Sequence, residues 1–515
     1  MKAVLIERNR YFDSVFLMRV SHELELLPGI GRAIVSMATP TNLEGLLRVG
    51  FAIDPADGEL LPQDLVVALD AASQEAIDSA TERLAALLAG DDGAGWADAF
   101  AAGAPATTRD AVAGDPALNL ALISVPGRYA AREARRALRL GLHVMLFSDN
   151  VSVEDEIELK DEAIGRDLLM MGPDCGTAIL NGVPLGFANA VRDGAVGIVG
   201  ASGTGMQEIS TIVHRLGGGV SQAIGTGGRD LSEAVGGRMT IAAIAALGGD
   251  PRTEVLVVVS KAPPPEIAAR VVAALRASGK PAVAHFVTGG DEVREDGVIT
   301  TDTLADAAYE ACRALGIEPH EEPAPPVPEV DQLGSGQRFV RSLFCGGTLA
   351  QEAWHLLRRG GRAVVSNVAS DPEMRIAAGS EVEGHVVWDL GDDAFTVGVP
   401  HPMIEPALRD DLVARCGDDP SVLAVLTDCV LGYGAHPDPA GSLADAAALA
   451  MTHARAGGRT LFVFASVTGT EGDPQGYERQ RERLRATGIH VAMSNASACR
   501  AAARVVETIE RRGHG

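Results

Sequence analysis

The fold is decided by Val196-Gly197-Ile198-Val199-Gly200-Ala201-Ser202-Gly203-Thr204-Gly205-Met206-Gln207-Glu208, which covers residues 196–208. The stretch opens with an apolar run, passes through a glycine-rich turn and ends where a helical pattern begins. A short apolar strand that turns directly into a helix is typical of an α/β domain with a parallel sheet. The glycines permit the sharp turn and let a ligand approach the backbone amides closely.

The same pattern occurs again in Val340-Arg341-Ser342-Leu343-Phe344-Cys345-Gly346-Gly347-Thr348-Leu349-Ala350-Gln351-Glu352. An offset of 144 residues separates Gly203 from Gly347. A second matched feature follows each copy, because Asp250-Pro251 and Asp419-Pro420 both precede an apolar strand, with an offset of 169. Two matched features in the same order indicate a duplicated unit with an insertion in the second copy.

Composition limits the function classes. The chain has 515 residues, enough for about three domains, and carries a formal charge of −25. A chain this acidic does not bind nucleic acid or anionic lipid through a general basic surface. The six cysteines are scattered without a CxxC pair, and we find neither a signal peptide nor an apolar membrane segment. We therefore expect a cytoplasmic protein in a reducing compartment that binds no nucleic acid and no membrane.

Strand-like and helix-like segments alternate along the whole chain, which predicts an α/β fold. Residues 90–115 are rich in Gly, Ala and Asp, and residues 318–336 are rich in Pro and Glu, so both are interpreted as linkers or surface loops. The pattern predicts four α/β parts, which cover residues 1–90 (a βαβαβα unit), 115–192, 193–320 and 337–515.

Glycine-rich loops at strand ends are the main candidates for ligand binding. Backbone amides and a helix N-terminus can hold an anion without Lys or Arg. The loop 200–205 (GASGTG) has neither the Lys of a Walker A motif nor the G-x-G-x-x-G spacing of a dinucleotide fold, and the alternative for each loop is that its glycines serve only tight turns. The candidate phosphate- or substrate-binding residues are Ser202, Gly203, Thr204, Gly205, Gly225, Thr226, Gly227, Gly228, Cys345, Gly346, Gly347 and Thr348.

Polar side chains at strand ends are candidate catalytic groups. Asn367, Asp389 and His401 are predicted to orient the substrate. The carboxylates would allow Mg²⁺ without requiring it, and the alternative is that they cap the next helix. His401 between two prolines is either a rigid-turn residue or a catalytic group. Cys345 at a helix start is either an activated thiolate or a buried, inert thiol. We predict no metal ligands.

These motifs resemble a known family. The sequences 172–176 (GPDCG), 197–205 (GIVGASGTG) and 224–228 (IGTGG) are similar to the α subunit of succinyl-CoA synthetase. The whole chain more closely resembles the FdrA proteins, which share the early motif 39–42 (TPTN) and the late motif 398–404 (GVPHPMI). The resemblance covers about residues 1–510.

The resemblance implies an architecture and two possible activities. Residues 115–192 would be a CoA-binding-like Rossmann domain, and residues 193–320 and 337–515 would be two flavodoxin-like ligase domains. FdrA-type proteins are associated with oxamate carbamoyltransferase, a transferase of ureide (allantoin) catabolism that acts on oxamate or oxalurate with carbamoyl phosphate or phosphate. The alternative is an acyl-CoA synthetase component with CoA as cofactor, and its CoA-like site would comprise Ser124, Pro126, Gly127, Ser148, Pro173 and Asp174.

One departure from the synthetase pattern bears on both activities. Succinyl-CoA synthetases carry a phosphorylated His in a loop that corresponds to Thr288–Gly297, and this stretch has no His. His285 comes too early in the sequence to replace it. The carbamoyltransferase is therefore our first expectation, with other protein subunits as partners, small anions as substrates and an oligomeric assembly. The remaining alternative is a non-catalytic scaffold subunit.

Overall fold

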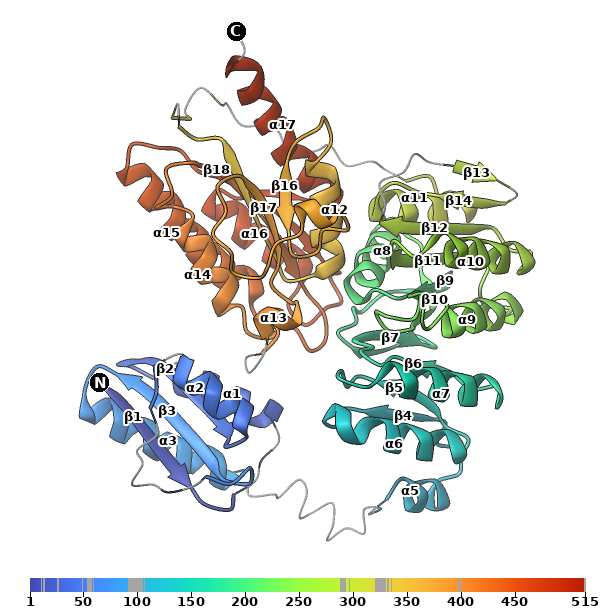
Figure 1. Ribbon diagram of the computed structural model, residues 1–515, viewed down its shortest axis with the longest axis horizontal. Helices are drawn as coiled ribbons and strands as arrows, with labels where there is room; N and C mark the ends of the chain where they lie inside the picture. The colour runs from blue at the N-terminus through green and yellow to red at the C-terminus, as the bar shows by residue number, and fades with distance from the viewer. Residues whose placement is uncertain are drawn as a thin grey trace. The chain divides into compact units, whose positions relative to one another are not determined.

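The computed structural model describes residues 1–10, 12, 14–25, 27–48, 50–52, 58, 60–90, 105, 107–287, 293–295, 297–319, 330, 333–334, 336–396 and 400–513. The chain divides into two compact units (Figure 1). The first comprises Met1–Ala117 and Thr396–Pro400, and the second comprises Leu118–Phe395 and His401–Gly515. Most of the predicted linker 318–336 lies outside the described residues.

The first unit has the predicted βαβαβα order. Its strands are β1 (Lys2–Glu7), β2 (Ile30–Met37) and β3 (Leu65–Ala71), and its helices are α1 (Ser14–Glu25), α2 (Pro40–Arg48), α3 (Gln74–Gly90) and α5 (Thr108–Gly114). The central strand β3 pairs antiparallel with β1 on one side and β2 on the other. Helix α5 lies in the stretch interpreted as a linker and has no buried residues, so the linker prediction was wrong in part.

The second unit begins with a small parallel sheet in the order β4-β5-β6. Its elements are β4 (Leu120–Ile123), α6 (Gly127–Arg139), β5 (His143–Leu146), α7 (Val153–Ile164) and β6 (Met170–Met171). Buried alanines on α6 let the helix pack closely on the sheet, while its arginines lie outside. The carboxyl ends of β4, β5 and β6 carry the residues predicted as a CoA-like site.

An eight-stranded sheet follows, in the order β13-β14-β12-β11-β9-β10-β7-β8. Its strands are β7 (Thr177–Leu180), β8 (Val183–Gly186), β9 (Asp193–Gly200), β10 (Val220–Gly225), β11 (Val255–Lys261), β12 (Ala282–Val287), β13 (Val293–Glu295) and β14 (Val298–Thr300). Its helices are α8 (Gly203–Arg215), α9 (Arg238–Gly249), α10 (Pro265–Ala277) and α11 (Leu304–Ala314). The β7–β8 hairpin was not predicted, and it turns at Asn181 and Gly182, which both have positive φ.

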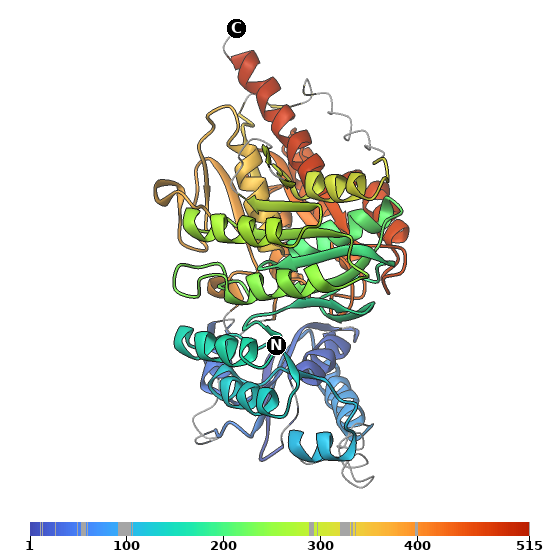
Figure 2. The ribbon, with the colours of Figure 1, turned by 90° about the vertical axis from the view of Figure 1, so that its right-hand side faces the viewer.

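A six-stranded parallel sheet completes the unit, in the order β16-β17-β15-β18-β19-β20. Its strands are β15 (Phe339–Phe344), β16 (Val364–Ser366), β17 (His385–Asp389), β18 (Val422–Val430), β19 (Phe462–Thr468) and β20 (His490–Ala492). Its helices are α12 (Gly347–Leu357), α13 (Asp393–Thr396), α14 (Ala407–Arg415), α15 (Pro439–Ala456), α16 (Tyr477–Thr487) and α17 (Asn495–Gly513), with a short 3-10 turn η3 (Pro372–Met374). Figure 2 shows α17 as one continuous helix that runs to the C-terminal end.

The two larger sheets are built alike. The central strand β9 pairs with β10 and β11, and the central strand β15 pairs with β17 and β18, always in parallel. Gly225 of β10 pairs with Gly200, and Asp389 of β17 pairs with Phe344, which is the position 144 residues after Gly200. We call the two arrangements, β9–α8 and β15–α12 with their neighbouring strands, the first and the second repeat.

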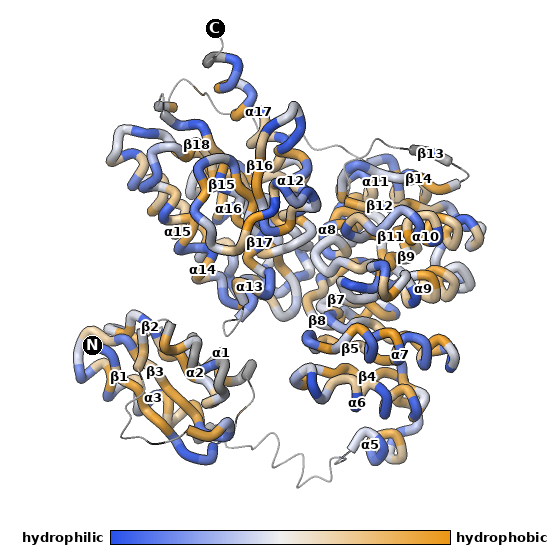
Figure 3. Tube along the Cα trace, in the orientation of Figure 1, coloured by the Kyte–Doolittle hydropathy of each residue, from blue (hydrophilic) through white to orange (hydrophobic). Residues whose placement is uncertain are grey.

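Apolar residues concentrate in the strands and on the inner faces of the helices, as the orange segments of Figure 3 show. The largest core cluster includes residues of α8, α12 and α17, so the two repeats share one core. The predicted α/β fold class is confirmed. Among the described residues, no helix is both long and apolar enough to cross a bilayer.

Candidate functional site

The N-termini of α8 and α12 meet where the two repeats pack together. Ser202 caps α8, and its Oγ accepts a hydrogen bond from the Gly205 amide at 3.0 Å. The same hydroxyl forms a short contact with the hydroxyl of Thr348 in α12. A side chain at Gly346 would collide with Thr204, because its Cβ would lie 2.9 Å from Thr204 Cγ2. The glycine therefore lets the two helix ends approach, and two of the predicted loops lie side by side.

The start of α8 has the features of an anion site. The first amides of a helix have no partner inside the helix, and together they carry about half a positive charge. Within the described part of the chain, the amides of Gly203 and Thr204 have no hydrogen-bond partner. Lys261 at the exposed end of β11 adds a positive charge, which opposes in part the burial that raises the pKa of both Asp174 and Asp389.

The start of α12 is different, because the chain supplies its own anion there. The carboxylate of Asp428 accepts hydrogen bonds from the amides of Cys345 at 2.8 Å and Gly346 at 2.9 Å. Arg409 is only 2 % exposed and donates to the Asp428 carbonyl at 3.2 Å. In the first repeat the place of Asp428 is taken by Val259, which pairs with Gly200. Two amides of the predicted 345–348 loop are therefore already used.

Cys345 is a buried thiol next to this carboxylate. Burial and the neighbouring Asp428 raise the pKa of the Cys345 thiol well above its usual value, and Arg409 opposes this only in part. All six cysteines are buried and unpaired. The arrangement favours the inert thiol over the activated thiolate among the two sequence-based alternatives.

Asp389 is held at the end of β17 beside the same helix. Asn367 bonds to its backbone in both directions, since Nδ2 donates to the Asp389 carbonyl and Oδ1 accepts from the Asp389 amide, each at 2.9 Å. The Asp389 carboxylate accepts from the Gly391 amide at 3.0 Å and lies so close to Gly347 that any side chain there would collide with it. Burial raises the pKa of Asp389 to about 7. The group can therefore both accept and donate a proton near neutral pH.

His401 is a neutral ring in a fixed orientation. The Met403 amide donates to its Nδ1 at 3.2 Å, so the proton of the neutral ring is on Nε2. Burial lowers the pKa of His401 to about 4. Its ring centroid lies 6.2 Å from that of Phe187, which the sequence analysis did not select. His401 is thus a hydrogen-bond donor that remains uncharged at neutral pH.

The 225–228 loop packs against the turn at Pro173 and Asp174. A side chain at Gly227 would collide with the Pro173 carbonyl, and the Thr226 amide donates to the Gly200 carbonyl at 2.8 Å. Burial and nearby carboxylates raise the pKa of Asp174 to about 6. The structure therefore brings together two groups that were predicted separately, the phosphate loop 225–228 and part of the CoA-like site.

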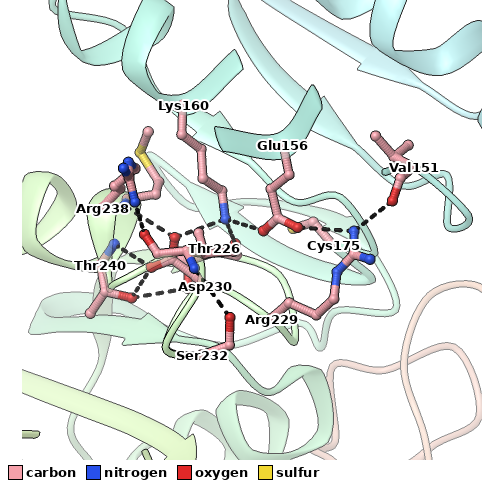
Figure 4. A network of polar contacts seen from close by, with 12 residues as sticks. Val151, Glu156, Lys160, Cys175, Thr226, Arg229, Asp230, Ser232, Arg238 and Thr240 are labelled. Atoms are coloured by element: carbon pink, nitrogen blue, oxygen red, sulfur yellow. Dashed lines mark hydrogen bonds and ion pairs between the residues drawn. The ribbon is translucent and has the colours of Figure 1, made fainter. Parts of the chain in front are cut away.

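A buried lysine donates a hydrogen bond to the backbone of this loop (Figure 4). Lys160 Nζ is fully buried and donates to the Thr226 carbonyl at 3.0 Å, to Glu156 at 2.6 Å and to Asp230 at 2.8 Å. Asp230 in turn accepts from the Thr240 amide at the start of α9. Sequence reasoning missed Lys160, because an i,i+4 pair of Glu and Lys is usually a solvent-exposed pair on a helix surface.

The rest of the predicted CoA-like site lies at the ends of β4 and β5. Ser124 and Pro126 are exposed, and Gly127 begins α6 where the carbonyls of the loop after β5 leave no room for a side chain. The Ser148 hydroxyl is buried and has no partner within the described residues. An orphaned buried hydroxyl fits a bound polar group, so this edge is compatible with CoA. No described group of three or more His, Cys, Asp or Glu side chains is placed to hold a metal ion.

Two buried glutamates lock the repeats together. Glu208 of α8 accepts from the Asn495 amide at the start of α17, at 2.9 Å. Glu352 of α12 accepts from the Leu304 amide at the start of α11, at 2.7 Å, and from Asn495 Nδ2 at 2.8 Å. Each glutamate therefore caps a helix that belongs to the other large sheet. Burial raises the pKa of both, that of Glu352 to about 7.

Three family models match the chain. Residues 1–100 match the heavy metal-associated domain of AllF, residues 191–288 match the CoA binding domain, and residues 343–505 match the CoA-ligase family. The first hundred residues contain no cysteine. The two other matches include the turn from β9 into α8 and the turn from β15 into α12, which form the candidate site.

Two relatives extend these matches. The chain is 42% identical over 499 residues to YahF of Escherichia coli K12, which covers 96% of both chains. It is 27% identical over 213 residues to the α-2 subunit of the mitochondrial ADP-forming succinate–CoA ligase of Trichomonas vaginalis, which covers 39% of this chain and 68% of the relative.

Among solved structures, the dinucleotide forming acetyl-coenzyme A synthetase 1 of Ca. Korarchaeum cryptofilum, in complex with phosphate and ADP, is 14% identical. The match covers 76% of this chain and 83% of that one, with a TM-score of 0.31. The family assignment rests on the domain matches and on the full-length similarity to YahF. The chain belongs to the FdrA/AllF family of succinyl-CoA-synthetase-like proteins.

Proposed function

We propose that the chain is the substrate-binding component of a CoA-ligase-type group transfer and holds a small phosphate- or carboxylate-bearing substrate at the start of α8. The observation that carries this proposal is the contrast between the two helix N-termini. The start of α8 has open amides with Lys261 nearby, whereas in the second repeat Asp428 binds the Cys345 and Gly346 amides of the turn that leads into α12, and Asp389 lies against Gly347, its first residue. A chain with a net charge of −25 attracts an anion only through such a local device.

The surrounding side chains fit the chemistry of acyl transfer. The amides of Gly203 and Thr204 would bind phosphate oxygens, and Asp389 would exchange a proton with the reacting group because its pKa is about 7. His401 Nε2–H would donate to the substrate carbonyl. CoA, when bound, supplies the thiol that accepts an acyl group, and the residues that would hold it are Ser124, Pro126, Gly127, Ser148, Pro173 and Asp174.

The activated phosphate must come from elsewhere. The sequence from Thr288 to Gly297 contains no His that could carry a phosphoryl group. His285 is buried within β12, and its Nδ1 lies 3.0 Å from the Thr301 carbonyl. We therefore propose that the substrate arrives as a preformed acyl or carbamoyl phosphate, or that a partner subunit supplies the nucleotide site. We also propose that the chain functions in an oligomeric complex in the cytoplasm.

The absence of a relay histidine favours a second candidate function, carbamoyl transfer between carbamoyl phosphate and oxamate. Carbamoyl phosphate brings its own phosphate, so the transfer needs no phosphoenzyme. Both partners are small anions that a glycine-rich helix start can bind.

A panel of ligands distinguishes the two candidates. Thermal unfolding of the full chain would be followed with phosphate, succinate, CoA, carbamoyl phosphate, oxamate and ATP. A ligand at 100 times its dissociation constant stabilises the folded state by about 2.7 kcal/mol. Stabilisation by CoA and phosphate supports the ligase component, whereas stabilisation by carbamoyl phosphate and oxamate without CoA supports carbamoyl transfer. If none of the six ligands stabilises the chain, both candidate functions are contradicted, and the non-catalytic scaffold subunit is the remaining alternative.

A further inference from the structure

The outer strand of the small sheet, β4, has one edge to which no strand of the described part of the chain is paired. On its other edge, the carbonyls of Asn119 and Ile123 accept hydrogen bonds from the β5 side at 2.8 Å and 2.9 Å. Backbone groups alternate between the two edges of a strand, so Leu120 and Leu122 present their N–H and C=O groups at the unpaired edge. Such an edge is a template for a strand of another chain.

The side chains of β4 do not protect this edge from pairing. Folded proteins usually block outer strands with charged residues or proline. The outer strands β8 and β13 contain Pro184 and Arg294, whereas β4 consists of Leu, Ala, Leu and Ile. Leu122 of β4 is 51 % exposed, and Leu118 just before the strand is 43 % exposed. Exposed leucines beside unpaired backbone groups indicate a contact surface for a further chain.

Helix α6 borders this edge with a mixed flank. α6 packs on β4 and β5, and α7 packs on β6, so α7 lies on the side away from the β4 edge (Figure 1). The alanines of α6 are buried, and Arg135 and Arg139 form ion pairs with α7. At about 100° of rotation per residue, the flank opposite α7 carries one aromatic, one acidic, one basic and one aliphatic residue. These are Tyr129, Glu133, Arg136 and Leu140.

We infer that β4 and this flank of α6 form the contact surface of a dimer of the chain, in which two β4 strands pair antiparallel across a twofold axis. Neighbouring strands lie about 4.8 Å apart, and each α6 lies over the gap between β4 and β5. The two α6 helices would therefore run antiparallel at about 10 Å, which is the distance of packed helices. The inference goes beyond the proposed function and does not depend on the anion site.

The flank of α6 is complementary to itself, which favours a second copy over an unrelated partner. An axis that places Glu133 of one copy opposite Arg136 of the other also forms the reciprocal pair. The same axis places Tyr129 opposite Leu140, because both pairs have the same midpoint along the helix. Arg136 already lies 2.8 Å from Glu133 within one chain, and Tyr129 is 49 % exposed. Opposite charges and apolar groups therefore meet across the axis.

Sedimentation velocity of the full chain tests this dimer through charge reversal. We expect wild type to sediment as a dimer. Glu133→Arg and Arg136→Glu each place like charges across the axis, so each should weaken dimerisation by at least about tenfold. An equimolar mixture of the two variants should dimerise again, because one chain is then basic at both positions and the other is acidic at both.

Two further variants separate the strand edge from a general charge effect. Leu122→Lys places a charge on the β4 edge and should also give a monomer. Asp411→Arg breaks an exposed ion pair with Arg415 on α14 and should leave the dimer intact. A wild type that is monomeric at every concentration, a dimer that survives the charge reversals or Leu122→Lys, or a mixture that stays monomeric would overturn the inference.

Discussion

The two repeats have the same backbone arrangement, but the strand ends that flank the helix start carry carboxylates only in the second repeat. In the second repeat Asp389 and Asp428 flank the start of α12. The corresponding positions of the first repeat are Gly225 and Val259, so no carboxylate from these strands reaches the start of α8. The comparison teaches that a glycine-rich turn makes an anion site only where neighbouring strands do not supply the anion themselves.

Removal of Lys160 should have the largest effect, because it would break the polar network behind the first repeat. Lys160→Met leaves the buried Asp230 without its cation and leaves Glu156 with Arg229 as its remaining ion-pair partner. We expect a loss of about 3–5 kcal/mol in the free energy of unfolding, measured with urea. The double variant Lys160→Met/Asp230→Asn should recover part of the loss, since it removes the charge that Lys160 compensates. Wild-type stability of Lys160→Met would contradict the view that this cluster holds the 225–228 loop.

Removal of Asp428, the carboxylate that the second repeat supplies itself, should have the next largest effect. Asp428→Ala deletes the hydrogen bonds from the Cys345 and Gly346 amides and removes one of the negative charges near Arg409, whose ion pair with Asp410 remains. We expect a loss of about 1.5–3 kcal/mol in the free energy of unfolding. Val259→Ala at the matching position of the first repeat removes only apolar contacts and serves as the control. If added phosphate stabilises Asp428→Ala more than it stabilises wild type, the start of α12 has become a second anion site.

Alanine at the first position of α8 or of α12 tests the same comparison through the free energy of unfolding. Gly347→Ala would collide with Asp389, so we expect a loss of about 1–3 kcal/mol. Gly203→Ala meets only the hydroxyl of Thr177 at 3.0 Å, which can rotate, and should cost less than about 1 kcal/mol. Thermal unfolding of the two variants would show this order, and the reverse order would contradict the placement of Asp389.

The pH dependence of the free energy of unfolding should show the smallest effect, counted per pH unit. Because the folded-state pKa of Asp389 is raised from 3.8 to about 7, the folded state binds more protons than the unfolded state between these values. Stability contributed by the protonated group is therefore present below pH 3.8 and is lost as the pH rises to about 7. Asp389→Asn should make the decline shallower by at most roughly 1.4 kcal/mol per pH unit, measured by urea unfolding at several pH values. Equal slopes for the two proteins would contradict a buried, proton-binding Asp389.

Much of the fold could be predicted from the sequence. Apolar strands that turn through glycine into helices indicated parallel sheets, and the 144-residue offset indicated the two repeats. The β7–β8 hairpin was missed, although Asn181-Gly182 is a typical two-residue hairpin turn. Its two short strands join the sheet of the first repeat, and only tertiary pairing with β10 shows this.

The candidate site was predictable in part. The helix-start glycines and Asp389 stand at strand ends, where the sequence itself places them. The role of Asp428 was not foreseen, because its contacts with Cys345 and Gly346 depend on strand pairing over more than eighty residues. Phe187 and Lys160 have no signal in their local sequence, because a single aromatic ring or an i,i+4 pair is usually structural.

The central claim is that the start of α8 binds the substrate anion, and calorimetric titration of Gly203→Pro with phosphate tests it most directly. Proline is well tolerated at the first position of a helix and removes one amide donor, and the extended backbone of Ser202 permits it. Val153→Pro at the first position of α7, after the similarly extended Ser152, is the matched control. The account predicts that wild type and Val153→Pro bind one phosphate per chain with equal affinity and that Gly203→Pro binds it at least about tenfold more weakly. Equal phosphate binding by all three proteins would contradict it.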